Sequence, residues 1–379
     1  MTKITYLLGA GASYNACPIW NMQAQAMRNL GSQELTKDYV KNISNNNPPT
    51  DWLSEDSKKY IQTNKQRILR EILYFGTKAL EFNTIDTYAR KLFLQNKTKE
   101  LELLKMSVSV FFDLWENFNK ERSFFQNNNQ KENKYWKQID SRYINLFSIF
   151  LEKSSENLVL NEDVNFITWN YDLQLEMTYN SFAYDSDKVD FELIDNNLPF
   201  LEKQDSERIN KVFHLNGHRG FASGKEKESV YELCKKDSFD DYWKTHEHLY
   251  DSLKSEKSTF QNHIKYGWEH DLNSDWFQKI GRILKQTDIL VIIGYSFPLF
   301  NRRIDQFLFS HLHQNKIKEI IYQDPYSDDE TILNLFKHPE RFESKIRLLK
   351  ETNQFHIPHT HFINQGNSNS GFEIRAITL

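Results

Sequence analysis

Cysteine is scarce in this chain. Among 379 residues there are two, Cys17 and Cys234, and no pair has the CxxC spacing. A structural zinc site built from four cysteines of this chain is therefore excluded. A disulfide between two cysteines so distant in sequence is possible but disfavoured. This cysteine usage fits a reducing compartment, so we expect a cytoplasmic protein.

Long apolar runs and an excess of positive charge are also missing. No segment reaches the roughly 18 apolar residues that a membrane span needs, and the apolar run before the first glycines is too short for a signal peptide. The formal net charge is −4 with 26% charged residues. We therefore expect neither membrane contact nor direct nucleic-acid binding. Aromatic residues, in contrast, make up 14% of the chain and can fill a sizeable core.

Apolar segments that end in polar or glycine residues predict a sheet. The first is KITYLLGAGAS, a short strand that runs into a glycine turn. Further strand patterns cover residues 164–172, 211–220, 287–298 and 318–325. The 287–298 segment is the most apolar of these and predicts a central parallel strand. The pattern favours an α/β fold with a doubly wound, mostly parallel, Rossmann-like sheet.

A large helical insertion interrupts this pattern. From residue 31 to 161 we find no convincing strand. Helical patterns there cover about 57–82, 84–95, 98–126 and 135–155. Another helical, aromatic-rich stretch spans about 225–286.

The predicted organisation has three parts. Residues 1–30 and 160–330 form the nucleotide-binding domain, and residues 31–159 form the helical insertion. Residues 331–379 form an extension that packs on the sheet. This extension carries a helix, and its final segment GFEIRAITL is a candidate closing strand.

The segment GAGAS, residues 9–13, is a candidate phosphate-binding turn. Gly9 and Gly11 allow a close backbone approach, and amide groups at the start of a following helix can hold a pyrophosphate. Ser13 can cap that helix or donate a hydrogen bond. Tyr14 stands where the full GxGxxG pattern has its third glycine. A tight strand-to-helix turn without a ligand is the alternative.

Polar residues alternate at the end of the next predicted strand, in FITWNYD. Thr168, Asn170 and Asp172 lie there, at the edge of the sheet where open α/β proteins bind ligands. The asparagine and aspartate can position a sugar hydroxyl or a water molecule. An Asx turn that caps the following helix is the alternative.

The segment HLNGHRG follows another predicted strand. His214 and His218 lie on either side of Asn216 and Gly217. A histidine at this edge of a sheet is a candidate base near neutral pH. A hydrogen-bonded loop histidine without a catalytic role is the alternative.

The most apolar strand runs into IGYSFP. Gly294, Tyr295 and Ser296 can approach a ribose or an adenine through backbone contacts. The arginines at positions 302–303 suit either a phosphate contact or, more simply, a solvated helix face. Asp324, just past the last predicted strand, can accept hydrogen bonds from the adenosine ribose.

Taken in order, these motifs resemble those of the sirtuin family, and in particular the prokaryotic sirtuin-like NADases of antiphage defence. The combination of TxNYD and IGYSFP is typical of the defence-type branch. The matching positions are Gly9, Ala10, Gly11, Ser13, Pro18, Thr168, Asn170, Asp172, Gly217, Gly294 and Ser296.

The resemblance implies hydrolysis of the bond between nicotinamide and ribose in NAD, which is the substrate, without a metal. Asn170 would hold the ribose hydroxyls or the water, Asp172 would support the turn or the developing positive charge, and His214 would be the base. The remaining NAD-binding positions would be Gly9, Ala10, Gly11, Ser13, Thr168, Asn216, Gly217, Gly294, Tyr295, Ser296 and Asp324.

The resemblance also implies regulation, because an uncontrolled NADase would kill its host. We expect homo-oligomerisation, or a partner such as a helicase-like ATPase, an Argonaute-type protein or a nucleotide-processing enzyme. The role would be that of an NAD-depleting effector in abortive infection.

The chain departs from the family at the third motif. Asn216 stands where the family's catalytic histidine directly precedes the glycine, so His214 or His218 has taken over, or the site is weakened. The missing CxxC pairs argue against protein deacylation. The alternatives are a non-catalytic NAD or ADP-ribose sensor and, less favoured, an NAD-dependent deacylase or ADP-ribosyltransferase.

Overall fold

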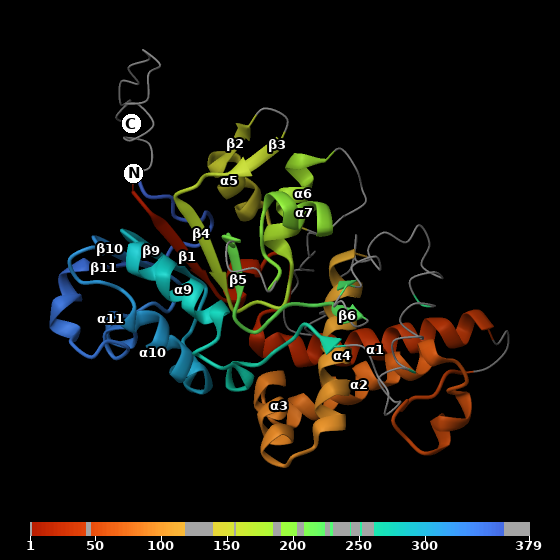
Figure 1. Cartoon of the computed structure of the whole chain (residues 1–379). Coiled ribbons are helices and arrows are strands. Elements are labelled where there is room, and N and C mark those ends of the chain that lie inside the picture. The colour runs from red at the N-terminus through yellow and green to blue at the C-terminus, as the bar shows by residue number, and fades with distance from the viewer. Residues whose placement is uncertain are drawn as a thin grey trace.

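A sheet of six parallel strands forms the centre of the computed structural model (Figure 1). The structure describes residues 2–42, 47–117, 139–154, 157–184, 191–202, 208–223, 228–229, 243, 251 and 261–359. In spatial order the strands are β11 (Ile346–Leu349), β10 (Glu319–Gln323), β9 (Ile289–Ile293), β1 (Ile4–Leu8), β4 (Val164–Thr168) and β5 (Val212–His214). Numbered along the chain, this is the 3-2-1-4-5-6 order of doubly wound sheets, with its reversal between β1 and β9.

Helices cover both faces of the sheet, which confirms the predicted α/β class. One face packs against α5 (Ser141–Phe150), α6 (Gln174–Ala183) and α7 (Phe191–Asn197). The other face packs against α9 (Asp275–Gln286), α10 (Arg302–Ser310) and α11 (Asp329–Leu333). Strands β1, β4 and β9 are consequently buried at every position. Burial on both faces explains why they appear as uninterrupted apolar runs in the sequence.

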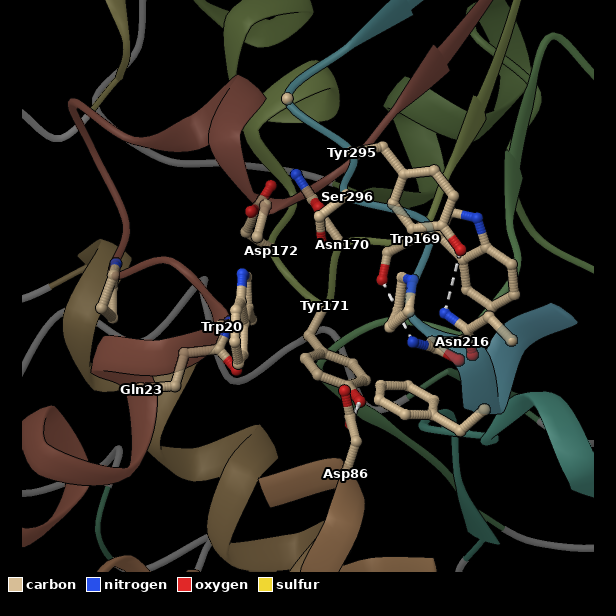
Figure 2. Close-up of a pocket in the computed structure, with 16 residues that line it drawn as sticks. Trp20, Gln23, Asp86, Trp169, Asn170, Tyr171, Asp172, Asn216, Tyr295 and Ser296 are labelled. Carbon is tan, nitrogen blue, oxygen red and sulfur yellow. Dashed lines mark hydrogen bonds between the residues drawn. The ribbon is translucent and has the colours of Figure 1, made fainter. Parts of the chain in front are cut away.

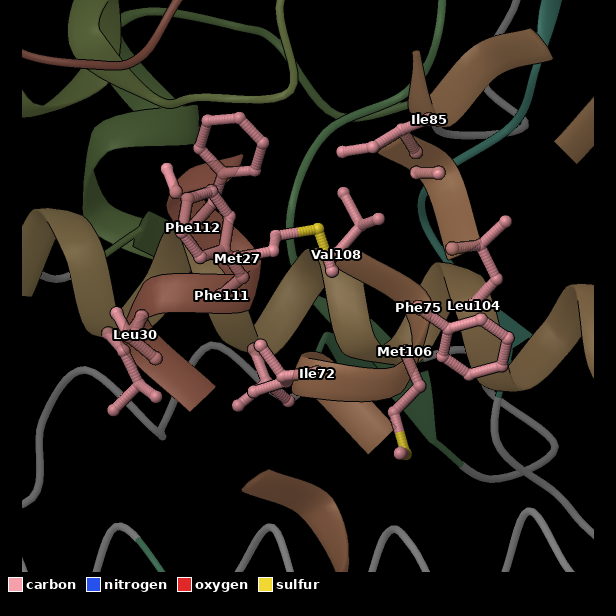
Figure 3. Close-up of a cluster of buried hydrophobic side chains, with 14 of the residues drawn as sticks. Met27, Leu30, Ile72, Phe75, Ile85, Leu104, Met106, Val108, Phe111 and Phe112 are labelled. Carbon is pink, nitrogen blue, oxygen red and sulfur yellow. The ribbon is translucent and has the colours of Figure 1, made fainter. Parts of the chain in front are cut away.

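Four helices form a separate body, here called the helical module, at the carboxyl ends of the strands (Figure 1). They are α1 (Trp20–Asn42), α2 (Asn64–Glu81), α3 (Ile85–Leu94) and α4 (Thr98–Asn117). Their apolar side chains form most of a third core, in which Met27, Phe75 and Phe111 are almost completely buried (Figure 3), and Tyr171, Phe221 and Tyr266 from outside the four helices complete it. This core is distinct from the two clusters that cover the sheet.

Two glycines bring α1 and α2 into backbone contact. A Cβ atom added at Gly31 would lie 2.7 Å from the backbone nitrogen of Leu73, and one added at Gly76 would lie 2.5 Å from that of Arg28. Each helix therefore contributes one glycine to a contact that no side chain separates.

The helical module differs from the predicted insertion at both ends. Helix α1 runs without a break through residue 30, and its apolar side chains belong to the module's core. Helix α5 packs on the sheet instead. Helix α2 begins at Asn64, later than predicted, because Thr63 and Gln66 form a capping box. The predicted continuation of α4 beyond residue 117 lies outside the described residues.

The predicted helix over 135–155 is wrong beyond Phe150. Residues Leu151–Ser154 form strand β2, which pairs antiparallel with β3 (Asn157–Leu160). The expectation of no strand between residues 31 and 161 is therefore wrong as well. Each strand has only four residues, and the partner three residues away stabilises an extended form that no periodic pattern announces.

The carboxyl-terminal part contributes a strand that the sequence did not predict. β11 pairs with β10 and completes the sheet. The candidate closing strand GFEIRAITL lies outside the described residues, as does most of 225–260. A small antiparallel sheet combines β6 (Phe221–Ser223), β7 (Glu228–Ser229) and β8 (Gln261–Asn262).

Neither a membrane-spanning helix nor a metal-binding cluster is found among the described residues. No helix in the described part of the chain combines the length and the apolarity that crossing a membrane requires. Nor do the described histidine, cysteine, aspartate and glutamate side chains form a group of three or more that could hold a metal ion.

Candidate functional site

A cavity lies between the carboxyl edge of the sheet and the helical module (Figure 2). Its empty volume is about 710 Å³, counting the part that opens to solvent, which is within the range of small-molecule sites. The lining residues come from the ends of β1, β4 and β9, from nearby loops, and from α1 and α3. They are Ala10, Pro18, Trp20, Gln23, Asp86, Trp169, Asn170, Tyr171, Asp172, Asn216, Gly294, Tyr295, Ser296, Pro298, Phe300 and Asn301.

The glycine turn packs tightly against the end of β9. The amides of Gly9 and Gly11 donate to the carbonyls of Ile293 and Gly294, each at 2.9 Å. Gly294 has φ +60°, and a Cβ atom there would lie 2.4 Å from the carbonyl carbon of Gly11. The backbone amides of Gly9 and Gly11 therefore already have hydrogen-bond partners within the protein.

The residues after the first glycine form only a short 3-10 helix, Ala10–Ser13, and α1 begins at Trp20. No α-helix therefore starts directly behind the glycines, and a following helix begins only after an intervening loop. Of the GAGAS segment, Ala10 lines the cavity. Ser13 is buried behind it, where its hydroxyl accepts a hydrogen bond from Asn170.

The turn after β4 places two polar side chains in the cavity wall. The Thr168 hydroxyl accepts from the Asn170 amide at 3.1 Å and so shapes the turn. The Nδ2 atom of Asn170 donates to Ser13 Oγ at 3.1 Å, whereas its Oδ1 atom is buried and finds no hydrogen-bond partner among the described residues. An acceptor left open in a cavity wall suits a ligand donor.

Asp172 serves both roles that the sequence left open, the cap of the following helix and a side chain in the ligand-binding edge. Its Oδ1 atom accepts from the Gln174 amide at the start of α6, at 3.3 Å, and its side chain also lines the cavity. Burial and the neighbouring Glu116 carboxylate raise the pKa of Asp172 to about 7, against a smaller opposing effect of the Ser13 hydroxyl. A carboxyl group with such a pKa exchanges protons near neutral pH.

A buried ionic network fixes this turn to the helical module. Glu116, near the end of α4, accepts hydrogen bonds from the backbone amide of Leu173 and from the side chains of Gln174 and Arg219. Arg219 also donates to Asp113 at 2.7 Å. The charge next to Asp172 is therefore carried by α4.

His214 lies behind the cavity wall and does not line it. Its Nε2 atom is 2.9 Å from Glu176 Oε1, and its Nδ1 atom is 3.3 Å from the Asn170 carbonyl oxygen. Burial lowers the pKa of His214, but the combined effects of the Glu176 carboxylate, the Asn170 carbonyl and Asp172 outweigh it, and the net pKa is raised. The geometry makes His214 a support for the Asn170 backbone.

The other residues of the third motif take different positions. The Nδ1 atom of His218 donates to the Arg219 carbonyl at 2.9 Å, and burial lowers the pKa of His218 well below its usual value. Asn216 lines the cavity and donates to the Trp169 carbonyl at 3.3 Å. Gly217 has φ +63°, and a Cβ atom there would lie 1.8 Å from the His263 carbonyl oxygen. No histidine belongs to the described cavity lining.

Aromatic rings form one side of the cavity. Trp169 and Tyr295 stack with ring centroids 5.5 Å apart, and no described residue hydrogen-bonds to the buried Nε1 atom of Trp169. The Tyr295 hydroxyl donates to Asp305, which fixes the ring. Gly294 and Ser296 lie on either side of Tyr295 and also line the cavity.

Several predicted positions lie outside the cavity lining: besides Asp324, Arg302 and Arg303, these are Gly9, Gly11, Ser13, Thr168, His214 and Gly217. Asp324 follows β10, where its Oδ1 atom accepts from the Tyr326 amide at 2.8 Å. Arg302 and Arg303 begin α10, and Arg303 is exposed. None of these residues lines the cavity.

No sequence motif predicted the cavity residues that come from the helical module. Trp20 and Gln23 come from the first turn of α1, and Asp86 comes from the start of α3. The Tyr171 hydroxyl donates to Asp86, and burial raises the pKa of Asp86 to about 6 (Figure 2). The described lining therefore contains two carboxyl groups and no lysine, arginine or histidine.

No protein-family model matches this chain, and no curated protein matches it either.

Proposed function

We propose that this protein is an NAD glycohydrolase of sirtuin-like fold, which splits NAD into nicotinamide and ADP-ribose. One observation carries the proposal: four separate motifs contribute to a single cavity at the point where the strand order of the sheet reverses. They are represented there by Ala10, Asn170, Asn216 and Gly294. Open α/β sheets bind their ligands at this point.

The lining fits the nicotinamide end of NAD. Planar rings suit the aromatic wall of Trp169 and Tyr295. The open Oδ1 atom of Asn170 would accept a hydrogen bond from a ribose hydroxyl. Because no basic side chain belongs to the described lining, the diphosphate is best placed outside the cavity.

This reaction needs little acid catalysis from the protein, because the leaving group departs as a neutral molecule. The bond between ribose C1′ and the pyridinium nitrogen breaks, its electron pair goes to nicotinamide, and nicotinamide leaves as a neutral molecule. Water adds to C1′ and loses a proton. Asn170 would orient the ribose or the water, and the Asp172 carboxylate would stabilise the developing positive charge or accept that proton. His214 would hold the Asn170 backbone in position.

The proposal includes control of the activity. We propose a cytoplasmic effector of antiphage defence that is switched on by homo-oligomerisation or by a partner. Candidate partners are a helicase-like ATPase, an Argonaute-type protein or a nucleotide-processing enzyme. The resemblance of the motifs supports this part of the proposal.

A second candidate is a sensor that binds NAD or ADP-ribose without cleaving it. The position of the histidines favours it, because neither His214 nor His218 lines the cavity and Asn216 does. The two candidates share a binding site and differ in whether nicotinamide is released.

The test is nicotinamide release from NAD by the purified full chain. Asn170→Ala is expected to reduce the rate about 10²- to 10³-fold, as for loss of one transition-state contact. The matched control is Asn145→Ala, an exposed asparagine on α5, which should keep the wild-type rate. His214→Ala shows whether the supporting histidine is needed. NAD binding without release by the wild type would point to the sensor or to an enzyme that lacks its activator, and neither binding nor release would refute both candidates.

A further inference from the structure

Asp86 is the acidic side chain that the helical module brings to the cavity. It lies in the first turn of α3 and lines the cavity next to Tyr171 (Figure 2). Among the described residues, no lysine, arginine or histidine forms an ion pair with it. Its hydrogen bond from the Tyr171 hydroxyl is a neutral contact. The negative charge of Asp86 is thus directed at the cavity without a cation to balance it.

The surroundings of Asp86 make this charge costly in the empty cavity. Burial raises the pKa of Asp86 to about 6, which measures how poorly its charge is solvated there. A positively charged ligand would relieve that cost by supplying the missing opposite charge. Asp172, the other carboxyl group of the lining, acts in the same direction. A negatively charged ligand would be disfavoured by both.

The rest of the lining indicates the shape of such a ligand. Trp169 and Tyr295 present stacked rings, and aromatic faces attract cations as well as flat molecules. The Oδ1 atom of Asn170 is buried and has no partner within the described part of the chain, so a hydrogen-bond donor on the ligand would satisfy it. A flat, cationic heteroaromatic ring that carries an amide or hydroxyl donor meets all these demands.

We propose that Asp86 is a specificity-determining residue that makes the cavity selective for a cationic pyridinium ring over its neutral counterpart. The inference rests on the proposed function, since the pyridinium of oxidised NAD is such a ring. It adds that the helical module, and not the sheet, selects the charged form. The reduced dinucleotide has a neutral ring and would bind more weakly.

Two small probes test this without any hydrolysis. 1-Methylnicotinamide carries the pyridinium charge, whereas nicotinamide is neutral and otherwise closely similar. Their affinities for the full chain are measured by calorimetry. The wild type should prefer the cation, and Asp86→Asn should reduce that preference about tenfold, the order of effect expected for one poorly solvated opposite charge. Its affinity for neutral nicotinamide should change little, which also shows that the cavity is intact.

Matched variants complete the experiment. Asp86→Glu keeps the charge and should retain most of the preference, so it remains informative if the asparagine variant folds poorly. Asp329→Asn removes the same charge from the exposed start of α11 and should behave as wild type. Equal affinity of the wild type for both probes, or an unchanged preference in Asp86→Asn, would overturn the inference.

The outcome is separable from that of the proposed function. Asp86-dependent preference for the cation together with no nicotinamide release would support this inference without supporting the NADase proposal. Nicotinamide release from NAD with no effect of Asp86 on the preference would do the reverse.

Discussion

Replacing Asp172 by asparagine should stabilise the fold while removing a carboxylate from the cavity. Burial and Glu116 raise the pKa of Asp172 from 3.8 to about 7. The difference is about three pKa units, and each unit corresponds to about 1.4 kcal/mol. Ionising Asp172 therefore costs the folded state about 4 kcal/mol relative to the unfolded chain. The residue is only 6% exposed, so solvent screens little of this cost.

The effect depends on pH in a defined direction. Below pH 3.8 the carboxyl group is protonated in both states and the cost is absent. As the pH rises towards 7, the unfolded chain releases this proton while the folded state retains it, so the free energy of unfolding falls. Above pH 7 the loss is complete. Asparagine does not titrate, so the variant does not undergo this loss.

Urea unfolding at pH 5.5 and pH 8 measures the difference. The advantage of Asp172→Asn over the wild type should be about 2 kcal/mol at pH 5.5 and about 4 kcal/mol at pH 8. Asparagine keeps the acceptor that bonds the Gln174 amide, so this contact survives the change. Asp329→Asn, at an exposed position, should show the same difference from wild type at both pH values. An advantage that does not grow with pH would refute the reasoning.

Three other changes test the same region. Glu116→Gln removes the charge that raises the pKa of Asp172, so the acid limb of the pH–rate profile for nicotinamide release should move to lower pH. Arg219→Met leaves two buried carboxylates without their cation and should lower the free energy of unfolding by about 3–5 kcal/mol in urea. Gly294→Ala forces a side chain into the left-handed region and against the glycine turn, and calorimetry should show a loss of about 2 kcal/mol or more.

Buried strands were the most predictable part of the fold. β9 is covered on both faces and therefore consists of apolar residues alone, ILVII, which no helix of that length explains better. β11 is the opposite case. It lies at the edge of the sheet, has four residues, and carries Arg347 and Leu348 at exposed positions. Hydrogen bonding to β10 stabilises its extended form, which its own sequence pattern does not indicate.

The site was predictable where it depends on the carboxyl ends of strands. Asn170 and Gly294 are more than 100 residues apart, but β4 and β9 flank β1 in one parallel sheet, so their carboxyl ends lie at one edge. Asp86 could not be found in this way, because packing of Ile85 and Tyr88 in the helical core sets its position. His214 shows a second limit. The sequence placed it at a strand end, but only the position of Glu176 shows that the ring faces away from the cavity.

The glycine contact between α1 and α2 has a mechanical consequence. The backbones of α1 and α2 are in contact at Gly31 and at Gly76, and no side chains lie between them at these points. We therefore expect the two helices to move as one rigid unit. Trp20 lies at one end of this unit, and α3, which carries Asp86, packs against the unit. A displacement of α2, imposed on its outer surface, would therefore shift Trp20 and Asp86 together, although α2 itself does not line the cavity.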